Sequence, residues 1–330
     1  MRALVTGATG FIGSHLVEEL TVRGYEIRCL VRRTSNVAFL NSLDACLVQG
    51  SLDDPESLEN AVAEIDIVFH AAGLIKTKPG KSRDFYCVNC EGTQNLLDAM
   101  ARSGSQPKRF VYFSSQAAAG PSPASRPLTE DDPCNPITPY GRSKLEGERV
   151  VKEFTARGQC SYTIIRPPAV FGPRDREVLY YFKQARKGWL PAVGSARNKF
   201  SIVYVKDLVN AALQASESVQ AVNKTYFVCY PEAATWARVA ELFGKVLSIR
   251  CRVMTIPYPV AYTFAALNEL YAAIFDKISI IDREKIREVS QPSWLCSPEK
   301  IKSDIGFTPG SDIQEALRST VEWYKAHHLL

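Results

Sequence analysis

Apolar and polar positions follow two different patterns along this chain. In the first half, short apolar runs that end at glycine or polar residues are separated by longer segments of mixed polarity. Such runs are typical of strands buried on both faces of a parallel sheet, and the segments between them are typical of helices. Strands are expected at 3–6, 25–31, 45–48, 65–70, 109–114, 162–166 and 223–229, and helices at 11–23, from 55 onward, at 85–103 and at 140–157. This alternation predicts an α/β fold built on a doubly wound parallel sheet.

The pattern divides the chain into two parts. Beyond Pro167 the alternation of strand and helix breaks down, and the C-terminal third is expected to be mostly helical and irregular. We expect a ligand-binding sheet domain over 1–170, to which 201–230 returns. The remaining segments, 171–200 and 231–330, are expected to form a smaller, mostly helical substrate-binding cap. Such a cap lies over the carboxyl edge of the sheet, where ligands bind in doubly wound folds.

Three glycines with the spacing G-x-x-G-x-x-G join the first predicted strand to the first predicted helix. Gly7 lets the chain turn sharply off the strand, Gly10 leaves room for a ligand against bare backbone, and Gly13 lets the helix pack close to the strand. A pyrophosphate then lies on the free N–H groups at the positive end of the helix dipole. The loop residues expected to contact a dinucleotide are Gly7, Thr9, Gly10, Phe11, Ile12 and Gly13.

A candidate acid/base pair opens the long helix predicted after the fifth strand. Tyr140 and Lys144 are four residues apart and therefore lie on one helical face. A tyrosine has an ordinary pKa near ~10, and a fixed ammonium beside it favours the phenolate and lowers that value. Such a pair can move a proton on and off an alcohol oxygen. Ser114 and Ser115 stand at the end of the fifth strand, at the same edge, where a serine hydroxyl can orient the reacting oxygen.

Composition and charge exclude several other kinds of protein. With 46% apolar and 23% charged residues the chain is typical of globular proteins, and its net charge of +5 is spread without the basic block that nucleic-acid binding requires. The nine cysteines are scattered. Neither a second pair nor clustered histidines accompany Cys87 and Cys90, so we expect reduced thiols and no metal site. The first strand begins almost at Met1, so we expect no targeting peptide and a cytoplasmic location.

Taken together, the motifs resemble those of the extended short-chain dehydrogenases/reductases, the NAD-dependent epimerase/dehydratase family, over nearly the whole chain. The motifs that carry the resemblance are Thr6–Gly13, Gly50–Asp53, His70–Gly73, Val88–Thr93, Ser114–Ser115, Tyr140–Lys144, Arg166–Pro167 and Tyr204–Asp207. Among its branches, the dihydroflavonol reductases and 3β-hydroxysteroid dehydrogenases are the most similar in their motifs. The resemblance implies a Rossmann-type sheet and a nicotinamide dinucleotide cofactor.

The resemblance also implies a role for each matching residue. Ser115, five residues before Gly120, is then the catalytic serine, and Tyr140 is the proton donor or acceptor. Lys144 holds the nicotinamide ribose and lowers the pKa of the tyrosine. Further cofactor contacts are implied for Leu52, Asp53, Ala71, Ala72, Gly73, Asn89, Ser114 and Pro167. For Asn89 a buried structural amide is the alternative.

The end of the second predicted strand bears on the choice of cofactor. A carboxylate there binds the ribose 2′-hydroxyl and selects NAD. This chain instead has Arg32 and Arg33, followed by Ser35. Arginines can pair with a 2′-phosphate, and hydroxyl groups can complete the site. The sequence therefore favours NADP, with NAD as the alternative if both arginines are solvated loop residues.

Departures from the family pattern bear on the substrate, which is either a nucleotide sugar or a secondary alcohol or ketone. Gln116 and Ala117 stand where the dehydratases have an Asp-Glu pair, and Ala119 stands where the epimerases have a tyrosine. Phe200 stands where the epimerases have an arginine that holds the nucleotide diphosphate, and Lys199 or Arg197 is the alternative cation for that role. A phenylalanine has no donor for a diphosphate.

The segment 256–281 is rich in aromatic and aliphatic residues, but Asn268, Glu269, Asp276 and Lys277 interrupt it, which makes it a poor transmembrane span. We interpret it first as a core helix pair of the cap. The alternative is an apolar lid or a membrane-surface patch that serves a lipophilic substrate.

These observations favour an NAD(P)-dependent oxidoreductase that interconverts a secondary alcohol and a ketone on a largely apolar small molecule. A nucleotide-sugar epimerase of the same family is the first alternative, and a non-catalytic dinucleotide-binding sensor or scaffold is the second. We expect a homodimer without a nucleic-acid partner.

Overall fold

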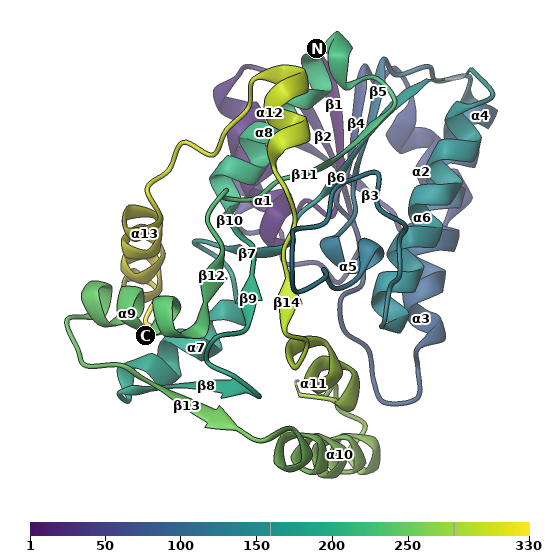
Figure 1. The fold of residues 1–330 in the computed structure, drawn as a ribbon. Helices are drawn as coiled ribbons and strands as arrows, with labels where there is room; N and C mark the ends of the chain where they lie inside the picture. Colours follow the sequence, from purple (N-terminus) through teal and green to yellow (C-terminus); the bar gives the residue numbers. More distant parts are fainter. Residues whose placement is uncertain (159, 280) are drawn as a thin grey trace.

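The computed structural model describes residues 1–158, 160–279 and 281–330 (Figure 1). Within these residues seven strands form a central sheet in the order β11-β6-β5-β4-β1-β2-β3, and every neighbouring pair is parallel. The strands are β1 (Arg2–Thr6), β2 (Glu26–Val31), β3 (Ala45–Gln49), β4 (Ile67–His70), β5 (Arg109–Phe113), β6 (Ser161–Arg166) and β11 (Lys224–Phe227). The predicted doubly wound α/β fold is confirmed, including the late return of the chain to the sheet at β11.

Helices cover both faces of this sheet (Figure 1). On one face lie α2 (Pro55–Val62), α4 (Gly92–Ser103) and α6 (Pro139–Thr155), and on the other lie α1 (Phe11–Val22), α8 (Val205–Glu217) and α12 (Glu299–Ile305). Successive side chains of a strand point to opposite faces. Accordingly Ala3 and Val5 belong to the core beneath α1 and α8, whereas Leu4 belongs to the core beneath α2, α4 and α6. The apolar runs of the sequence reflect this burial on both faces.

One predicted helix differs from expectation in its interior. The run expected at 85–103 begins at α3 (Arg83–Tyr86), widens into a π-helical turn η2 (Cys87–Glu91), and continues as α4. Asn89 lies in this turn and is fully buried. A π-turn re-aims the side chains of a helix and frequently marks a functional site.

The second half of the chain adds short strands that the sequence pattern did not predict. Besides the main sheet, the described residues form three small sheets with the orders β10-β7, β12-β9-β14 and β13-β8. The strands are β7 (Ala169–Phe171), β8 (Trp189–Val193), β9 (Lys199–Phe200), β10 (Ile202–Tyr204), β12 (Ala234–Thr235), β13 (Arg252–Ile256) and β14 (Ser293–Trp294). The helices are α5 (Gln116–Ala119), α7 (Glu177–Arg186), α9 (Trp236–Leu247), α10 (Tyr258–Ile274), α11 (Arg283–Val289) and α13 (Ile313–Ala326), with single 3₁₀ turns at Leu40–Ser42 and Val219–Ala221.

A buried ion pair fixes α6 to the carboxyl ends of β5 and β6. Glu148 of α6 is fully buried and accepts hydrogen bonds from Arg166 Nε at 2.8 Å and Nη2 at 2.6 Å. Ser114 Oγ donates to the same carboxylate at 2.5 Å. Because α6 also carries Tyr140 and Lys144, this pair sets the position of the helix relative to the strand ends.

We expect Glu148→Ala to destabilise the protein by about 3–5 kcal/mol, because it leaves the buried Arg166 guanidinium without its counter-ion. The matched control is Glu153→Ala in the same helix, whose carboxylate pairs with Arg149 on the exposed surface. That change should cost less than about 1 kcal/mol. Urea unfolding followed by circular dichroism measures both values, and equal losses for the two variants would contradict the prediction.

Candidate active site

The carboxyl ends of β1 and β4 meet at the point where the strand order reverses. Gly7 follows β1 with φ +73°, and a Cβ there would lie 2.6 Å from the backbone nitrogen of Ala72. A Cβ on Gly13 would lie 2.1 Å from the carbonyl oxygen of Gly7. These two glycines therefore have the conformation and the close packing that their spacing requires. Ala71 N donates to Thr6 O at 3.1 Å, which keeps the segment after β4 against the end of β1.

The first turn of α1 presents unpaired N–H groups at this edge. Gly10 is the N-cap residue, and no described side chain caps the helix. The amides of Phe11, Ile12 and Gly13 have no acceptor among the described residues, and Thr9 and Gly10 are exposed. An anion at this helix end would meet free donors and the positive end of the helix dipole. The loop therefore fits the pyrophosphate of a dinucleotide.

A chain of buried hydrogen bonds supports the strand ends from below. His70 at the end of β4 joins Thr6 Oγ1 through Nδ1 at 2.6 Å and Thr93 Oγ1 through Nε2 at 3.0 Å. Thr93 in turn donates to Asn89 O at 2.8 Å. Burial lowers the pKa of His70 to about 3, so the imidazole is neutral at physiological pH. The sequence motif contained His70 without a role, and the structure shows a structural one.

Asn89 is placed by the π-turn against the segment that follows β4. Its Oδ1 accepts from Leu74 N at 2.7 Å, and its Nδ2 donates to Leu74 O at 3.0 Å and to Ser143 Oγ at 3.0 Å. A Cβ on Gly73 would lie 3.1 Å from Asn89 Oδ1 and 3.7 Å from Lys144 Nζ. The side chain therefore matches the structural alternative, because its amide holds the backbone beside Lys144.

Local sequence determines where α6 begins and hence where Tyr140 lies. Thr138 is the N-cap, and its Oγ1 accepts from Gly141 N at 3.0 Å, while Pro139 occupies the first turn. The Tyr140 ring packs edge-on against Phe85 of α3, with centroids 6.0 Å apart. The helix packs tightly here, since a Cβ on Gly141 would lie 2.3 Å from Ala117 O.

Lys144 is buried to 3% exposure beneath the strand ends. Its Nζ donates to Phe113 O at 2.6 Å and lies 4.3 Å from the centroid of the Tyr112 ring. Burial lowers the pKa of Lys144 to about 7, against a smaller opposing effect of the Glu148 carboxylate. The ammonium is thus balanced near neutral pH rather than permanently charged.

The expectation that Lys144 lowers the pKa of Tyr140 is wrong for this structure. Burial raises the pKa of Tyr140, a hydrogen bond with the Ser115 side chain lowers it by less, and the charges of Glu288 and Lys285 act more weakly. The reason is geometric, because Lys144 Nζ is directed to Phe113 O and the Tyr112 ring. The phenol therefore stays protonated at neutral pH.

The two adjacent serines have different surroundings. Ser115 is the N-cap of α5, accepts from Ala117 N at 3.1 Å through Oγ, and lies beside the Tyr140 hydroxyl. Ser114 is buried, and its hydroxyl is bound to Glu148. Pro167 is also buried, and its carbonyl oxygen accepts from Gln116 N at 2.8 Å. Ser115 thus has the geometry of the predicted catalytic serine, whereas Ser114 belongs to the structural network.

The opposite end of the expected cofactor groove lies beyond β2 and β3. Arg32 and Arg33 are both exposed, and Ser35 N donates to Arg32 O at 2.9 Å in the turn that follows β2. The Ser51 hydroxyl donates to Asp53 and lowers the pKa of that carboxylate, and the charge of Arg32 adds a smaller effect of the same sign. Arg32 and Asp53 therefore lie close together. Asn95 Nδ2 fixes the backbone of Leu52 by donating to its carbonyl oxygen at 2.8 Å.

Residues that sequence reasoning missed come from α11 and α7. Lys285 and Glu288 of α11 lie 3.3 Å apart and are close enough to affect the pKa of both Tyr140 and Tyr181. Lys285 is 45% exposed, so water reaches it. The Glu288 carboxylate raises its pKa. Nothing near Tyr140 in the sequence points to these residues, because only the tertiary fold brings α11 to this edge.

Three aromatic side chains from α7, α9 and β9 form a cluster. The Tyr181 ring lies 5.3 Å from the Trp236 ring, which lies 5.0 Å from the Phe200 ring, measured between centroids. Lys199, next to Phe200 on β9, is exposed. Because adjacent strand residues point to opposite sides, Lys199 does not replace the missing arginine on the face of Phe200.

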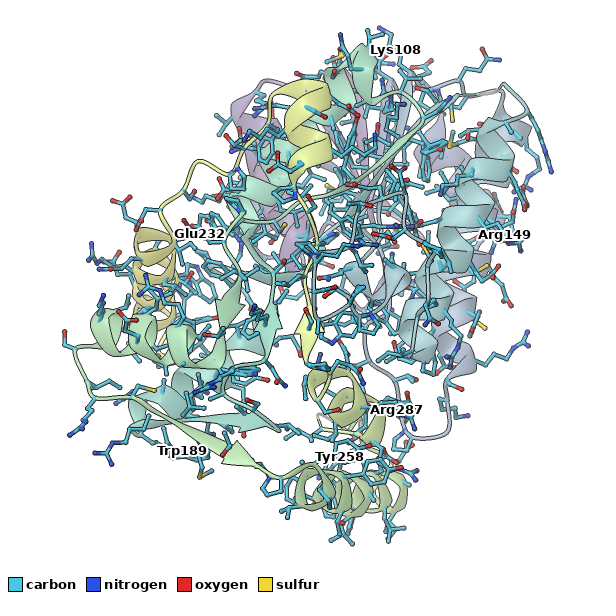
Figure 2. The ribbon with its side chains drawn as sticks, in the orientation of Figure 1. Lys108, Arg149, Trp189, Glu232, Tyr258 and Arg287 are labelled. Atoms are coloured by element: carbon cyan, nitrogen blue, oxygen red, sulfur yellow. The ribbon has the colours of Figure 1, made fainter. Side chains whose placement is uncertain are left out.

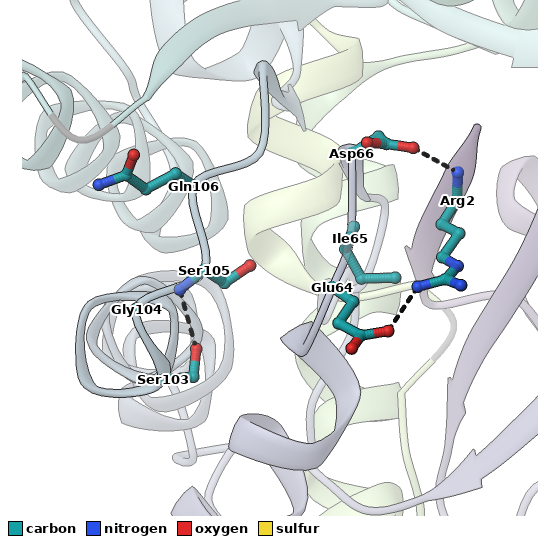
Figure 3. A pocket seen from close by; sticks show the side chains of 8 residues that line it. All are labelled: Arg2, Glu64, Ile65, Asp66, Ser103, Gly104, Ser105 and Gln106. Carbon is teal, nitrogen blue, oxygen red and sulfur yellow. Dashed lines mark hydrogen bonds and ion pairs between the residues drawn. The ribbon is translucent and has the colours of Figure 1, made fainter.

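A pocket of about 730 Å³ lies at the other end of the sheet (Figure 3). It is lined by residues at the start of β1, before β4 and after α4. The Arg2 guanidinium pairs there with Glu64, and the backbone N–H of Arg2 donates to the Asp66 carboxylate. Ligands of doubly wound folds bind at the carboxyl ends of the strands. This pocket lies at the amino ends, so it is separate from the site built around Tyr140.

The fold and the site together define an enzyme of the extended short-chain dehydrogenase/reductase class. The sequence profile of the NAD dependent epimerase/dehydratase family matches residues 3–229. The chain belongs to that family. The non-catalytic alternative is therefore set aside.

Named relatives span almost the full chain. The ceramide reductase of Caulobacter vibrioides is 28% identical over 98% of this chain and 94% of its own length. A sterol-4-alpha-carboxylate 3-dehydrogenase (decarboxylating) of Dictyostelium discoideum is 29% identical over 93% and 96%, respectively. The N-acetyl-alpha-D-glucosaminyl-diphospho-ditrans,octacis-undecaprenol 4-epimerase of Escherichia coli O157:H7 is 27% identical over 99% and 96%. Among solved structures, UDP-glucose 4-epimerase of Thermotoga maritima superimposes with a TM-score of 0.82, 24% identity and coverage of 99% and 100%, which supports the fold.

The depressed pKa of Lys144 predicts a specific pH dependence of stability. Between about pH 7 and the ordinary value of 10.5, the unfolded chain holds a proton that folded Lys144 has released, so the stability contribution of this residue rises with pH. Below pH 7 both states are protonated, and the full cost of burying the ammonium is present. Lys144→Met removes this rise.

The measurement is urea unfolding of wild type and Lys144→Met across this window, with the surface change Lys302→Met as control. The stability of wild type relative to Lys144→Met should increase with pH, and its stability relative to Lys302→Met should stay flat. A constant difference for Lys144→Met would show that its pKa is not depressed.

Proposed function

We propose that the protein interconverts a secondary alcohol and a ketone on a largely apolar, lipid-like substrate. The observation that carries this proposal is the aromatic cluster of Tyr181, Trp236 and Phe200, which stands where a nucleotide diphosphate would need cationic donors. Aromatic rings offer a large apolar area to bury, worth roughly 25 cal/mol per Å². Tyr181 of this cluster lies near the same pair, Lys285 and Glu288, that lies beside Tyr140.

We infer that a dinucleotide lies from the glycine loop to Lys144. Gly7, Gly10 and Gly13 would hold its pyrophosphate. The segment Ala71–Gly73, backed by Asn89, would line its path. When bound, it supplies or accepts a hydride.

The chain's own residues account for the proton in this reaction. In the reducing direction, the Tyr140 hydroxyl gives its proton to the carbonyl oxygen as that oxygen becomes an alcohol, and the reverse step returns it. The raised pKa of Tyr140 keeps this proton available at neutral pH. Ser115 would hydrogen-bond the same oxygen and orient it. Lys144 would bind the ribose beside it.

The relatives agree with a lipid-like substrate and leave the reaction type to experiment. One relative is named as a reductase of ceramide and another as a 3-dehydrogenase of a sterol carboxylate, and both of these compounds are lipids. The undecaprenol relative is named as a sugar 4-epimerase on a polyprenyl diphosphate, and for this reason epimerisation of a lipid-linked sugar is the second candidate. Lys285 is the exposed cation beside Tyr140 that could meet a diphosphate in that case.

A substrate panel tests the proposal. Keto-sphingolipids, 3-ketosteroids and flavonoid ketones are incubated with reduced nicotinamide cofactors, and absorbance at 340 nm reports turnover. We expect turnover with at least one lipid ketone, and we expect Tyr140→Phe to abolish it with little change in cofactor affinity. Phe200→Arg should raise KM for the ketone and leave cofactor affinity unchanged. In parallel, calorimetry measures binding of UDP, GDP and dTDP. Micromolar nucleotide binding without ketone turnover would overturn the proposal in favour of an epimerase.

We further propose that NADP is preferred over NAD, because Arg32 and Arg33 are exposed at the end of β2, where a 2′-phosphate would lie. Replacing both by serine should weaken NADPH binding about ten- to a hundredfold, the range of charge-assisted hydrogen bonds, and leave NADH nearly unchanged. Arg157→Ser, an exposed arginine at the other edge of the sheet, is the control. Fluorescence titration measures both constants, and equal losses for the two cofactors would refute this role.

The homodimer and the cytoplasmic location expected from the sequence stay predictions. Among the described helices, none combines the length and the apolar character needed to cross a bilayer.

A further inference from the structure

Helix α10 exposes apolar side chains along its whole length. It lies at the end of the molecule away from the sheet (Figure 1), and Tyr258 stands at its start (Figure 2). Of the fifteen large apolar side chains that are most exposed among the described residues, ten lie between 254 and 278. They are Met254, Tyr258, Val260, Phe264, Leu267, Leu270, Tyr271, Ile274, Phe275 and Ile278, each 40–67% exposed. Monomeric proteins rarely expose so contiguous an apolar surface without a partner.

The polarity of α10 is inverted relative to an ordinary surface helix. Asn268 and Glu269 face the protein, and Asn268 Nδ2 donates to Ser279 Oγ and to Ile281 O, each at 2.8 Å. The Glu269 carboxylate accepts from Arg283 N at 2.5 Å and from its Nε at 2.8 Å. The buried face is otherwise narrow and made of alanines at 261, 265 and 272. The segment was expected to be a core helix pair, but only the inner face of α10 is buried. The partners of Asn268 and Glu269 determine that this face points inward.

The charges that border this surface are mainly basic. Asp276 is paired with Lys78 at 2.6 Å, which leaves the neighbouring Lys277 without a carboxylate partner among the described residues. Lys277 Nζ lies 5.4 Å from the Tyr271 ring and 5.8 Å from the Phe275 ring, so its stem follows the apolar surface. At the other end, around the start of β13, four exposed basic residues have no ion pair among the described residues. They are Arg186 at the end of α7, Lys187 in the turn before β8, Arg250 just before β13 and Arg252 in β13.

This surface adjoins two segments that lead to the site. The chain leaves α10, bonds back to it through Ile281, and enters α11, which carries Lys285 and Glu288 beside Tyr140. On the other side, the segment after β4 is tied to the end of α10 by the Lys78–Asp276 pair. Ile75 in that segment is also exposed. An apolar substrate that entered between these elements would pass along α10.

We propose that the outward face of α10 lies in the interfacial layer of a membrane that contains anionic lipid and brings the site to a lipid substrate. The idea that membrane binding serves to deliver a lipid substrate rests on the proposed function. The binding itself rests only on the surface of α10. An apolar helix face with aromatic residues near both ends and basic neighbours is the chemistry of an interfacial helix. A two-fold dimer through α10 would bring the same basic borders together. A stable interface buries ~800 Å² of each partner. In such a dimer a single convex helix would have to supply that area.

Sedimentation with lipid vesicles tests the binding. Wild type should co-sediment with phosphatidylcholine vesicles that contain phosphatidylglycerol, and less with phosphatidylcholine alone. The double variant Leu267→Asp/Ile274→Asp should lose roughly a hundredfold in partitioning, since each buried aliphatic side chain is worth about tenfold. Lys277→Gln should weaken binding to anionic vesicles only. The control is Val22→Asp/Val219→Asp, which alters two equally exposed side chains elsewhere and should bind as wild type. Thermal unfolding verifies that all variants fold.

Two results would overturn the proposal. One is wild type that fails to bind anionic vesicles. The other is a dimer in light scattering that Leu267→Asp/Ile274→Asp converts to monomer, which would make a second copy the occupant of α10. The proposed function fails separately: vesicle binding without turnover of any ketone removes the substrate class alone, whereas turnover of a short-chain, water-soluble ketone without vesicle binding removes the membrane surface alone.

Discussion

The close approach of two strand ends is the constraint on which the site depends. Gly7 turns with φ +73° directly against the backbone that follows β4, and Gly13 brings α1 onto the same turn. Any side chain at either position would separate these segments. Because they touch, the free N–H groups of α1, the segment 71–73 and the buried Lys144 all lie at the same edge of the sheet. The chain of Thr6, His70, Thr93 and Asn89 then makes this arrangement rigid by satisfying its buried polar groups.

Burial determines the electrostatics of the acid/base pair more than pairing does. Lys144 has one carbonyl and one aromatic ring for partners, and both accept from it without carrying a full charge. Its pKa therefore falls toward neutrality, whereas the nearby Tyr140 rises. The two pKa values, which lie close together in the free side chains, are thereby moved apart. A negative charge or a new hydrogen-bond acceptor beside Lys144 would raise its pKa again.

Local signals made the framework predictable. The glycine spacing and the apolar strands each act within a few residues, and the structure has both where the sequence indicated. The helix expected at 140–157 is also present, and its Thr138 cap and Pro139 start were not singled out in the sequence. The sign of the Tyr140 shift was not predictable, because it depends on where Lys144 points. Lys285 and Trp236 were missed for a related reason, since strands of two residues and cap helices carry no pattern that aligns them with Tyr140.

The orientation of helix α10 could not be predicted from its sequence either. Its composition indicates burial, and an apolar helix with Asn268 and Glu269 on one side would ordinarily place those two in water. The structure places them inside because Ser279, the carbonyl of Ile281 and Arg283 satisfy them there, and an internally paired polar group loses little relative to hydration. The apolar face then turns outward at a cost in water that only an apolar surrounding removes. That cost disappears if the protein works at a membrane whose apolar layer covers α10. Because α10 precedes α11, which lies beside Tyr140, the membrane would then lie near the candidate acid/base pair.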